Sequence, residues 1–175
     1  VLEWGSGGST VHFPRFLRER GIAFTWNSVE HDDDWFRRVS GVVRGEDAVR
    51  VHHLPLRDLR PHGAAPESDR YVDFPEGIGR KFDVILVDGR FRRRCLLAAA
   101  RWLREDGEVF LHDAHRKYYH CAFRAWPQGR FLHQKMWRGR HVPPDLLRRA
   151  GDFLNFFYYR FLYKAHKALR GGRIP

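Results

Sequence analysis

Apolar residues fall in short runs that alternate with stretches in which they recur at helical spacing. The strongest run is 82–87, where five of six residues are apolar, and such a continuous run is typical of a parallel strand buried on both faces. The pattern predicts six strands, at 1–4, 22–29, 48–54, 82–87, 108–111 and 131–137. It predicts helices at 10–20, 33–39, 95–103, 117–126 and 145–169. The segment 55–79, rich in proline, glycine and charge, is expected to be a loop with a short strand near Tyr71.

Strands that alternate with helices indicate βαβ units, and so a doubly wound α/β fold in which a mostly parallel sheet is covered on both faces. We expect one domain at 1–142, followed by an aromatic and basic C-terminal helix at 143–175. Val1 already falls in a strand, so we expect a fragment or a chain cut at its front edge, without a helix before the first strand. Ligands bind such sheets beyond the carboxyl ends of the strands, where the strand order switches.

Composition narrows the class of protein. A chain of 175 residues with 43% hydrophobic content is long enough for one domain with a real core. Its two cysteines exclude a disulfide scaffold and a cysteine-rich zinc module, and they favour a reduced, cytoplasmic setting. No signal peptide and no apolar stretch of spanning length is found.

The net charge of +11 comes from arginines spread along the chain, which argues against a nucleic-acid partner and leaves an anionic substrate or a membrane surface open.

A glycine-rich loop follows the first predicted strand. Its glycines allow a tight turn and close approach of a ligand to the backbone, and the helix that follows favours a bound anion. A dinucleotide site requires a small residue where Thr10 stands, whereas S-adenosylmethionine sites carry an acidic residue before the glycines, as Glu3 does here. A plain tight turn would need the same glycines. The candidate cofactor-binding residues of the loop are Glu3, Gly5, Ser6, Gly7, Gly8 and Ser9.

Polar residues also follow the other predicted strands. The second ends in Glu30 and His31, and a carboxylate at this place can accept hydrogen bonds from both hydroxyls of a ribose. The aspartates at 32–34 suit the start of a helix. The 82–87 strand runs into Asp88-Gly89-Arg90, and the 108–111 strand into His112-Asp113.

Together these four blocks resemble the class I S-adenosylmethionine-dependent methyltransferases. The likeness is greatest to the O-methyltransferase-like branch, which has Asp-Gly-Arg after its fourth strand and His-Asp after its fifth, and it covers roughly 1–119. The resemblance implies that the loop 3–9 cradles the methionine end of the cofactor and that Glu30 holds its ribose. It also implies that Asp88 lies beside the transferred methyl group. Adenine contacts are expected in 55–79, and the closing antiparallel strand pair of that fold is not evident after Trp137.

A hydroxyl acceptor must lose its proton, either to a general base or through a metal that acidifies it. In one hypothesis Asp88 or His112 is the base and Arg90 orients an anionic acceptor. In the other, Asp88 and Asp113 converge from neighbouring strands and hold Mg²⁺. A zinc site is not favoured, because the histidines at 112, 115, 120 and 133 match no compact ligand set.

We therefore expect an S-adenosylmethionine-dependent enzyme that methylates an oxygen of a sugar or other small polar metabolite, free or within a glycan. One alternative is a nicotinamide dinucleotide-dependent oxidoreductase. Another is a non-catalytic, arginine-rich domain that binds nucleic acid or membrane. The surplus of aromatic residues in the predicted C-terminal helix suggests peripheral membrane contact or a homodimer.

Overall fold

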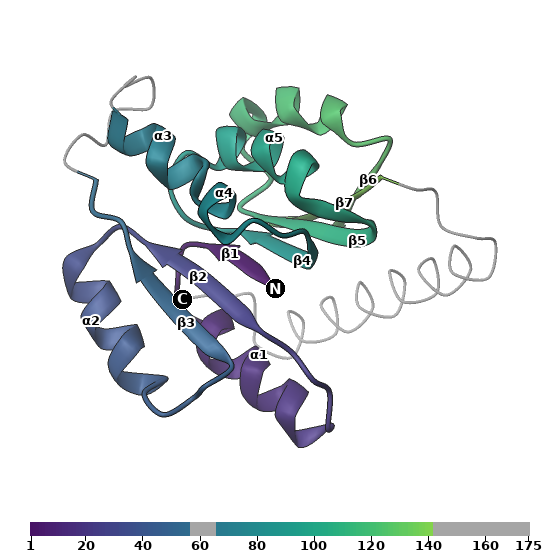
Figure 1. Cartoon of the computed structure of the whole chain (residues 1–175). Helices are drawn as coiled ribbons and strands as arrows, with labels where there is room; N and C mark the ends of the chain where they lie inside the picture. The colour runs from purple at the N-terminus through teal and green to yellow at the C-terminus, as the bar shows by residue number, and fades with distance from the viewer. Residues whose placement is uncertain (57–65, 142–175) are drawn as a thin grey trace, which may run out of the picture. The chain divides into compact units, whose positions relative to one another are not determined.

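The computed structural model describes residues 1–56 and 66–141, where seven strands form one sheet in the order β3-β2-β1-β4-β5-β7-β6 (Figure 1). β1 to β5 are parallel, β7 runs antiparallel to β5, and β6 runs antiparallel to β7. The strands are β1 Leu2–Trp4, β2 Trp26–Glu30, β3 Val49–His53, β4 Phe82–Val87, β5 Leu103–His112, β6 Gln128–His133 and β7 Met136–Arg140. The helices are α1 Gly8–Glu19, α2 Asp33–Val42, α3 Pro66–Val72, α4 Phe74–Ile78, α5 Arg92–Trp102 and the 3₁₀ helix η1 Lys117–Ala125.

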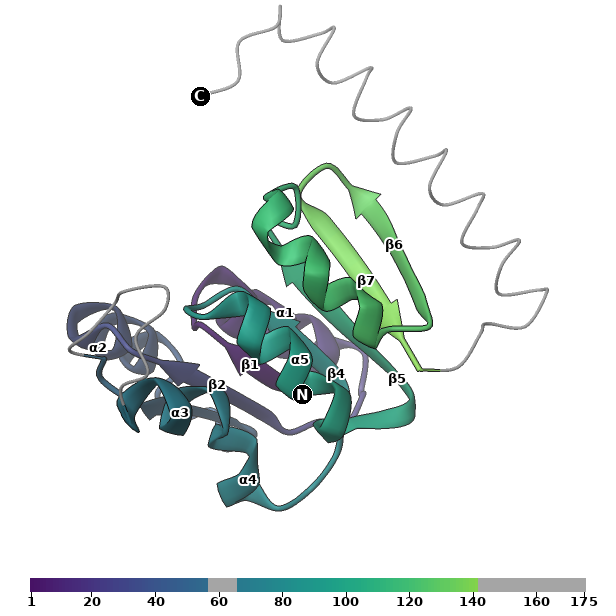
Figure 2. The ribbon, with the colours of Figure 1, turned by 90° about the horizontal axis from the view of Figure 1, so that it is seen from above.

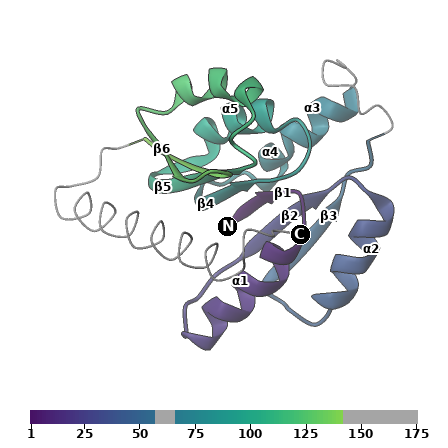
Figure 3. The ribbon, with the colours of Figure 1, turned by 180° about the vertical axis from the view of Figure 1, so that it is seen from behind.

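Helices cover both faces of the sheet. Seen from above and from behind, α1 and α2 lie on one face, and α3, α4, α5 and η1 lie on the other (Figures 2 and 3). The doubly wound, mostly parallel α/β fold predicted from the sequence is thus confirmed. The helix predicted at 143–175 lies outside the described residues. Within 1–56 and 66–141, no helix has the length and apolar character needed to cross a bilayer.

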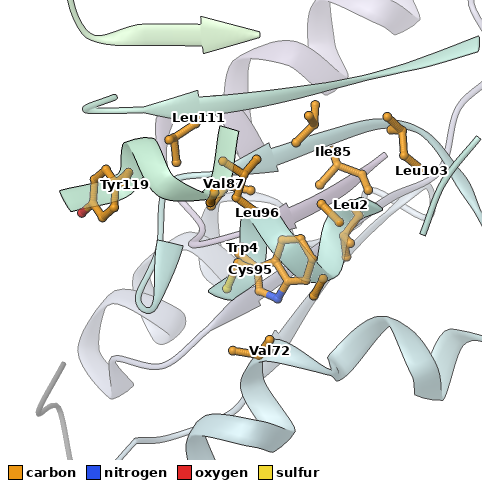
Figure 4. Packing of buried hydrophobic residues seen from close by; sticks show 14 of the residues in the cluster. Leu2, Trp4, Val72, Ile85, Val87, Cys95, Leu96, Leu103, Leu111 and Tyr119 are labelled. Carbon is orange, nitrogen blue, oxygen red and sulfur yellow. The ribbon is translucent and has the colours of Figure 1, made fainter. Parts of the chain in front are cut away.

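The core is densest where β1 and β4 lie side by side in the middle of the sheet. Leu2 and Trp4 of β1 are wholly buried, and so is Ile85 of β4 (Figure 4). Leu96 of α5 packs into the same cluster. Burying side chains of this size stabilises the fold by about 1.5–3 kcal/mol each. The loops that leave β1 and β4 therefore start from strands whose apolar side chains are wholly buried.

The prediction of a loop at 55–79 is wrong over its described part, which forms α3 and α4. Both helices are too short to show a clear 3.6-residue period. α3 is nevertheless fixed because Tyr71 and Val72 are buried against the core. Pro75 stands in the first turn of α4, where proline is tolerated because the amide it lacks has no partner there.

The single strand predicted at 131–137 is also wrong, because the chain turns back at 134–135 and forms the hairpin β6–β7. That turn lacks the glycine or asparagine pair that signals a tight hairpin. The closing antiparallel pair is therefore present although the sequence does not reveal it. Several boundaries also differ from prediction. Among the strands, β2 begins at Trp26 rather than at residue 22, and β5 begins at Leu103 rather than at residue 108; among the helices, α5 begins at Arg92 rather than at residue 95.

Candidate cofactor and active site

The glycine loop and the turn after β4 meet where the strand order reverses. β1 lies between β2 and β4, so the chain leaving it can reach the ends of both. The Gly5 amide donates to Val29 O (2.8 Å), and the Asp88 amide donates to Trp4 O (2.9 Å). Gly5 has φ +92°, and a Cβ there would lie 2.6 Å from the Gly89 nitrogen. Only glycine allows this contact between the two backbones.

Glu3, in β1 just before the glycine loop, fixes the loop through hydrogen bonds. Its side chain is wholly buried, and it accepts hydrogen bonds from Trp26 Nε1 (2.9 Å) and from three hydroxyl groups. Burial raises the pKa of Glu3, although its hydrogen bonds act in the opposite direction. Glu3 therefore ties the loop to β2 and α1. The three hydroxyl donors are those of Ser9, Thr10 and Ser28.

Glu30 ends β2 next to the loop and is 3% exposed. Its Oε2 accepts from the amide and the hydroxyl of Ser6, both at 2.9 Å. Its Oε1 accepts from the amides of His31 (2.8 Å) and Asp32 (3.0 Å). Burial alone would raise the pKa of Glu30, but the contact with the His31 ring and the three amides outweigh it and lower the pKa to about 2. The site thus holds a permanent anion beside the glycine loop.

The His31 ring links Glu30 to the turn after β4. His31 Nδ1 lies 2.8 Å from Glu30 Oε1, and Arg90 Nε donates to His31 Nε2 at 3.2 Å. This pattern requires the tautomer with hydrogen on Nδ1. Arg90 accordingly contacts the Glu30 side of the site, while Asp88 and His112 lie together on the other.

Asp88 and His112 form a pair at the ends of β4 and β5. His112 Nδ1 lies 2.9 Å from Asp88 Oδ1, and Arg92 Nη2 lies 2.9 Å from the same oxygen. The sequence analysis missed Arg92, which also donates to the main-chain oxygens of Asp88 (2.7 Å), Gly89 (3.0 Å) and His112 (2.8 Å). Arg92 follows Asp88 by four residues and stands in a first helical turn without an acidic residue, and this spacing was the sequence signal for a pair with Asp88.

Asp113 lies in the same cluster with a left-handed backbone (φ 55°). Burial would raise its pKa, but the charges of Arg92, His112 and Arg116 outweigh it and hold the pKa below the usual value. Arg92 Nη1 lies 3.3 Å from Asp113 Oδ2, so one guanidinium pairs with both carboxylates of the proposed Mg²⁺ site. Within 1–56 and 66–141, no group of three or more His, Cys, Asp or Glu side chains could hold a metal. These residues do not fit a Mg²⁺ centre.

A pocket of about 330 Å³ opens beside the Asp88–His112 pair. Glycine-loop residues form one end of it, and its walls come from Phe13, Leu86, Phe110 and Met136. Glu30, His31 and Arg90 lie outside its lining. The sequence-predicted residues therefore form two neighbouring groups on either side of the loop, one around Glu30 and one around this pocket.

Trp35 is a second residue that the sequence analysis missed. Its amide donates to the Asp32 carboxylate, which caps α2 as predicted, and its Nε1 donates to Ser6 O at 2.6 Å. The indole also lies 3.9 Å from the position that a Cβ on Gly7 would take. A tryptophan in the first turn of the predicted helix 33–39, close after the candidate ribose carboxylate, was the available signal in the sequence.

The residues present fit S-adenosylmethionine. The loop gives backbone access, Glu30 supplies a fixed anion at the end of the next strand, and the pocket continues from the loop toward Asp88. In dinucleotide-binding loops a small residue occupies the place of Thr10. Here Thr10 is wholly buried, and its hydroxyl donates to Glu3 at 2.6 Å.

No family model and no curated protein matches the sequence. Among solved structures, the chain is similar to a methyltransferase-like protein from Silicibacter pomeroyi, with 23% identity, 89% of this chain and 85% of that chain covered, and a TM-score of 0.52. It is also similar to spermidine synthase from Thermotoga maritima, with 14% identity, 83% of this chain and 53% of that chain covered, and a TM-score of 0.46. A TehB-like SAM-dependent methyltransferase from Corynebacterium glutamicum matches with 14% identity, 79% of this chain and 77% of that chain covered, and a TM-score of 0.45. Only the first TM-score exceeds 0.5. The chain therefore shares the fold of this methyltransferase-like protein from Silicibacter pomeroyi.

Proposed function

We propose that this protein is an S-adenosylmethionine-dependent methyltransferase acting on a hydroxyl group of a small acceptor. The observation that carries the proposal is the Glu30 carboxylate, held ionised by three amides beside a glycine loop. Such a group can accept hydrogen bonds from both hydroxyls of a ribose. Thr10 and the buried Glu3 favour S-adenosylmethionine over a nicotinamide dinucleotide.

When bound, S-adenosylmethionine supplies a methyl group already activated by its positive sulfur. The chain's main task is then alignment, which can contribute about 7–11 kcal/mol to lowering the barrier. Residues 5–9 would hold the amino-acid end of the cofactor. Glu30 would accept hydrogen bonds from the ribose hydroxyls in place of its contacts with the Ser6 hydroxyl and the His31 ring. Trp35 and Ser6 keep the loop against α2 and β2.

His112 acts as the general base in this proposal. Asp88 accepts the hydrogen of His112 Nδ1, which leaves Nε2 as the proton acceptor of a ring that lines the pocket. Arg92 holds the Asp88 carboxylate in place from the start of α5 and joins the ends of β4 and β5. Asp88 thereby orients the base, and Asp113 forms a second ion pair with Arg92.

Calorimetric titration tests the cofactor directly. We expect heat with S-adenosylmethionine and none with NAD⁺ or a short oligonucleotide. Glu30→Gln should weaken binding about 100-fold, because it removes hydrogen bonds to a charged acceptor that are worth about 1.5–3 kcal/mol each. Asp34→Asn is the matched control, since Asp34 lies in the same helix start with a side chain that is 90% exposed. Equal binding by both variants, or heat with NAD⁺ alone, would contradict the proposal.

The expectation of a sugar or other small polar acceptor belongs to this proposal as one alternative. The pocket beside His112 provides a way to choose between acceptor classes.

A further inference from the structure

We propose that the acceptor is a hydroxyl on an apolar aromatic ring, bound in the pocket between α1 and the strands β4, β5 and β7. This inference rests on the proposed function. The ring would lie against Phe110, with Phe13 across the pocket, and its hydroxyl would point to His112 Nε2.

The strand register places the apolar walls and the base on one continuous surface. Leu86 is the cross-strand neighbour of Phe110, and Met136 is the cross-strand neighbour of His112. Phe110 and His112 are two residues apart on β5, so their side chains share a face of the sheet. These four side chains form a patch on which an acceptor would contact carbon and sulfur atoms before it reaches the base.

Phe13 provides the opposite wall. It stacks on Trp26 with ring centroids 6.1 Å apart and remains 51% exposed. Phe16, one turn further along α1, is 47% exposed but does not line the pocket, and its ring is covered by the Arg20 guanidinium. The half-exposed Phe13 therefore gives the pocket a second aromatic surface, which a planar ring can contact.

The pocket has both a polar and an apolar lining. Asp88, His112 and the glycine loop lie at the carboxyl ends of the strands, while the walls come from two phenylalanines, a leucine and a methionine. A ring with one hydroxyl matches this division. A sugar would place several hydroxyls against the apolar walls, and each one left unpaired costs about 1–3 kcal/mol.

The acidity of the acceptor hydroxyl also favours an aromatic acceptor. A phenolic hydroxyl has a pKa near 10 and loses its proton more readily than an alcohol, so one histidine base suffices. In the transfer, a lone pair of the acceptor oxygen forms the new O–C bond while the C–S bond breaks and its electrons go to sulfur. The hydroxyl proton passes to His112 Nε2, and Asp88 balances the imidazolium. The positive charge lost by the sulfonium therefore reappears on the imidazolium of His112, and the charges balance.

Ligand-observed saturation-transfer NMR on the full chain tests the binding. The probes are 4-methylphenol and methyl glucoside, each without cofactor. We expect saturation of the phenol only, with at least a fivefold loss in Phe13→Ala and in Phe110→Thr, and with no change in the matched control Phe16→Ala. Saturation of the glucoside to the same extent, or an equal response of Phe13→Ala and Phe16→Ala, would overturn the inference.

Methyl transfer to the same two probes separates the two proposals. Binding of S-adenosylmethionine with methylation of the phenol, lost in His112→Gln, supports both. Cofactor binding with methylation of the glucoside alone overturns the aromatic acceptor and leaves the proposed function standing. Absence of cofactor binding removes the proposed function, while the NMR experiment still reports on the pocket.

Discussion

Two buried carboxylates lie on either side of the glycine loop, and their environments act in opposite directions. Glu3, beneath the loop, has a raised pKa, while Glu30, at the end of β2, has a pKa lowered to about 2. Both side chains are almost fully buried and both accept at least four hydrogen bonds. Burial acts to raise the pKa of both carboxylates, and only at Glu30 do the hydrogen-bond partners outweigh it.

The kind of donor contributes to this difference, together with burial and with the His31 ring beside Glu30. Three of the four donors to Glu3 are hydroxyls, which can rotate and accept a hydrogen bond instead, so a protonated Glu3 can also be accommodated. Three donors to Glu30 are backbone amides, which cannot reverse. Fixed amide dipoles favour the charged form, whereas adaptable hydroxyls tolerate either form. Glu3 is thus suited to support the loop, and Glu30 to bind a ligand as an anion.

Substitution of Glu3 gives the largest expected effect on stability. Glu3→Ala removes the acceptor that four donors share and opens a cavity, although Trp26 Nε1 keeps a second acceptor in Ser28 Oγ (3.0 Å), so the free energy of unfolding should fall by about 4 kcal/mol. Glu3→Gln should cost less than about 1.5 kcal/mol, because the hydroxyls can accept from its amide. Urea denaturation measures both. Equal losses would show that the charge of Glu3, and not its hydrogen-bonding capacity, supports the loop.

The dependence of stability on pH should differ in sign between the two carboxylates. Folding lowers the pKa of Glu30 from 4.5 to about 2, so its contribution of about 3 kcal/mol is fully present above pH 4.5 and is lost as the pH falls through 2. Folding raises the pKa of Glu3 from 4.5, so its contribution is present below pH 4.5 and is lost as the pH rises through the folded value.

Urea unfolding of the wild type and of Glu30→Gln and Glu3→Gln between pH 2 and pH 7 tests this contrast. The stability difference between the wild type and Glu30→Gln should shrink toward pH 2. The difference between the wild type and Glu3→Gln should become less favourable to the wild type toward pH 7. Parallel curves for the two variants would contradict the contrast.

Much of the fold and one half of the site follow from local sequence. The run 82–87 and the glycine loop predict β4, β1 and the switch point, because each signal lies in consecutive residues. Glu30 is predicted for the same reason, as the last residue of a short apolar strand. The short helices α3 and α4 and the β6–β7 hairpin are missed, because Tyr71 is fixed by long-range packing and the hairpin turn lacks glycine.

The missed site residues act through contacts distant in sequence. Arg92 joins the ends of β4 and β5 by bonding Asp88 and, 20 residues away, the carbonyl of His112. That bridge joins residues far apart in the sequence, so no pattern in consecutive residues indicates it. The Mg²⁺ hypothesis lacks support for a related reason, because the Arg92 guanidinium pairs with both Asp88 and Asp113.

Trp35 supplies the smallest expected effect and tests how the loop is held on its Glu30 side. Trp35→Phe keeps an aromatic ring but removes the hydrogen bond from Nε1 to Ser6 O. One such bond at an exposed site is worth about 1 kcal/mol, so S-adenosylmethionine affinity should fall about fivefold while stability changes by less than 1 kcal/mol. Phe36→Leu, at the adjacent position facing His53, is the control and should leave affinity unchanged. A loss as large as that of Glu30→Gln would mean that the loop is held mainly from α2, and that the amide cage around Glu30 contributes little to positioning it.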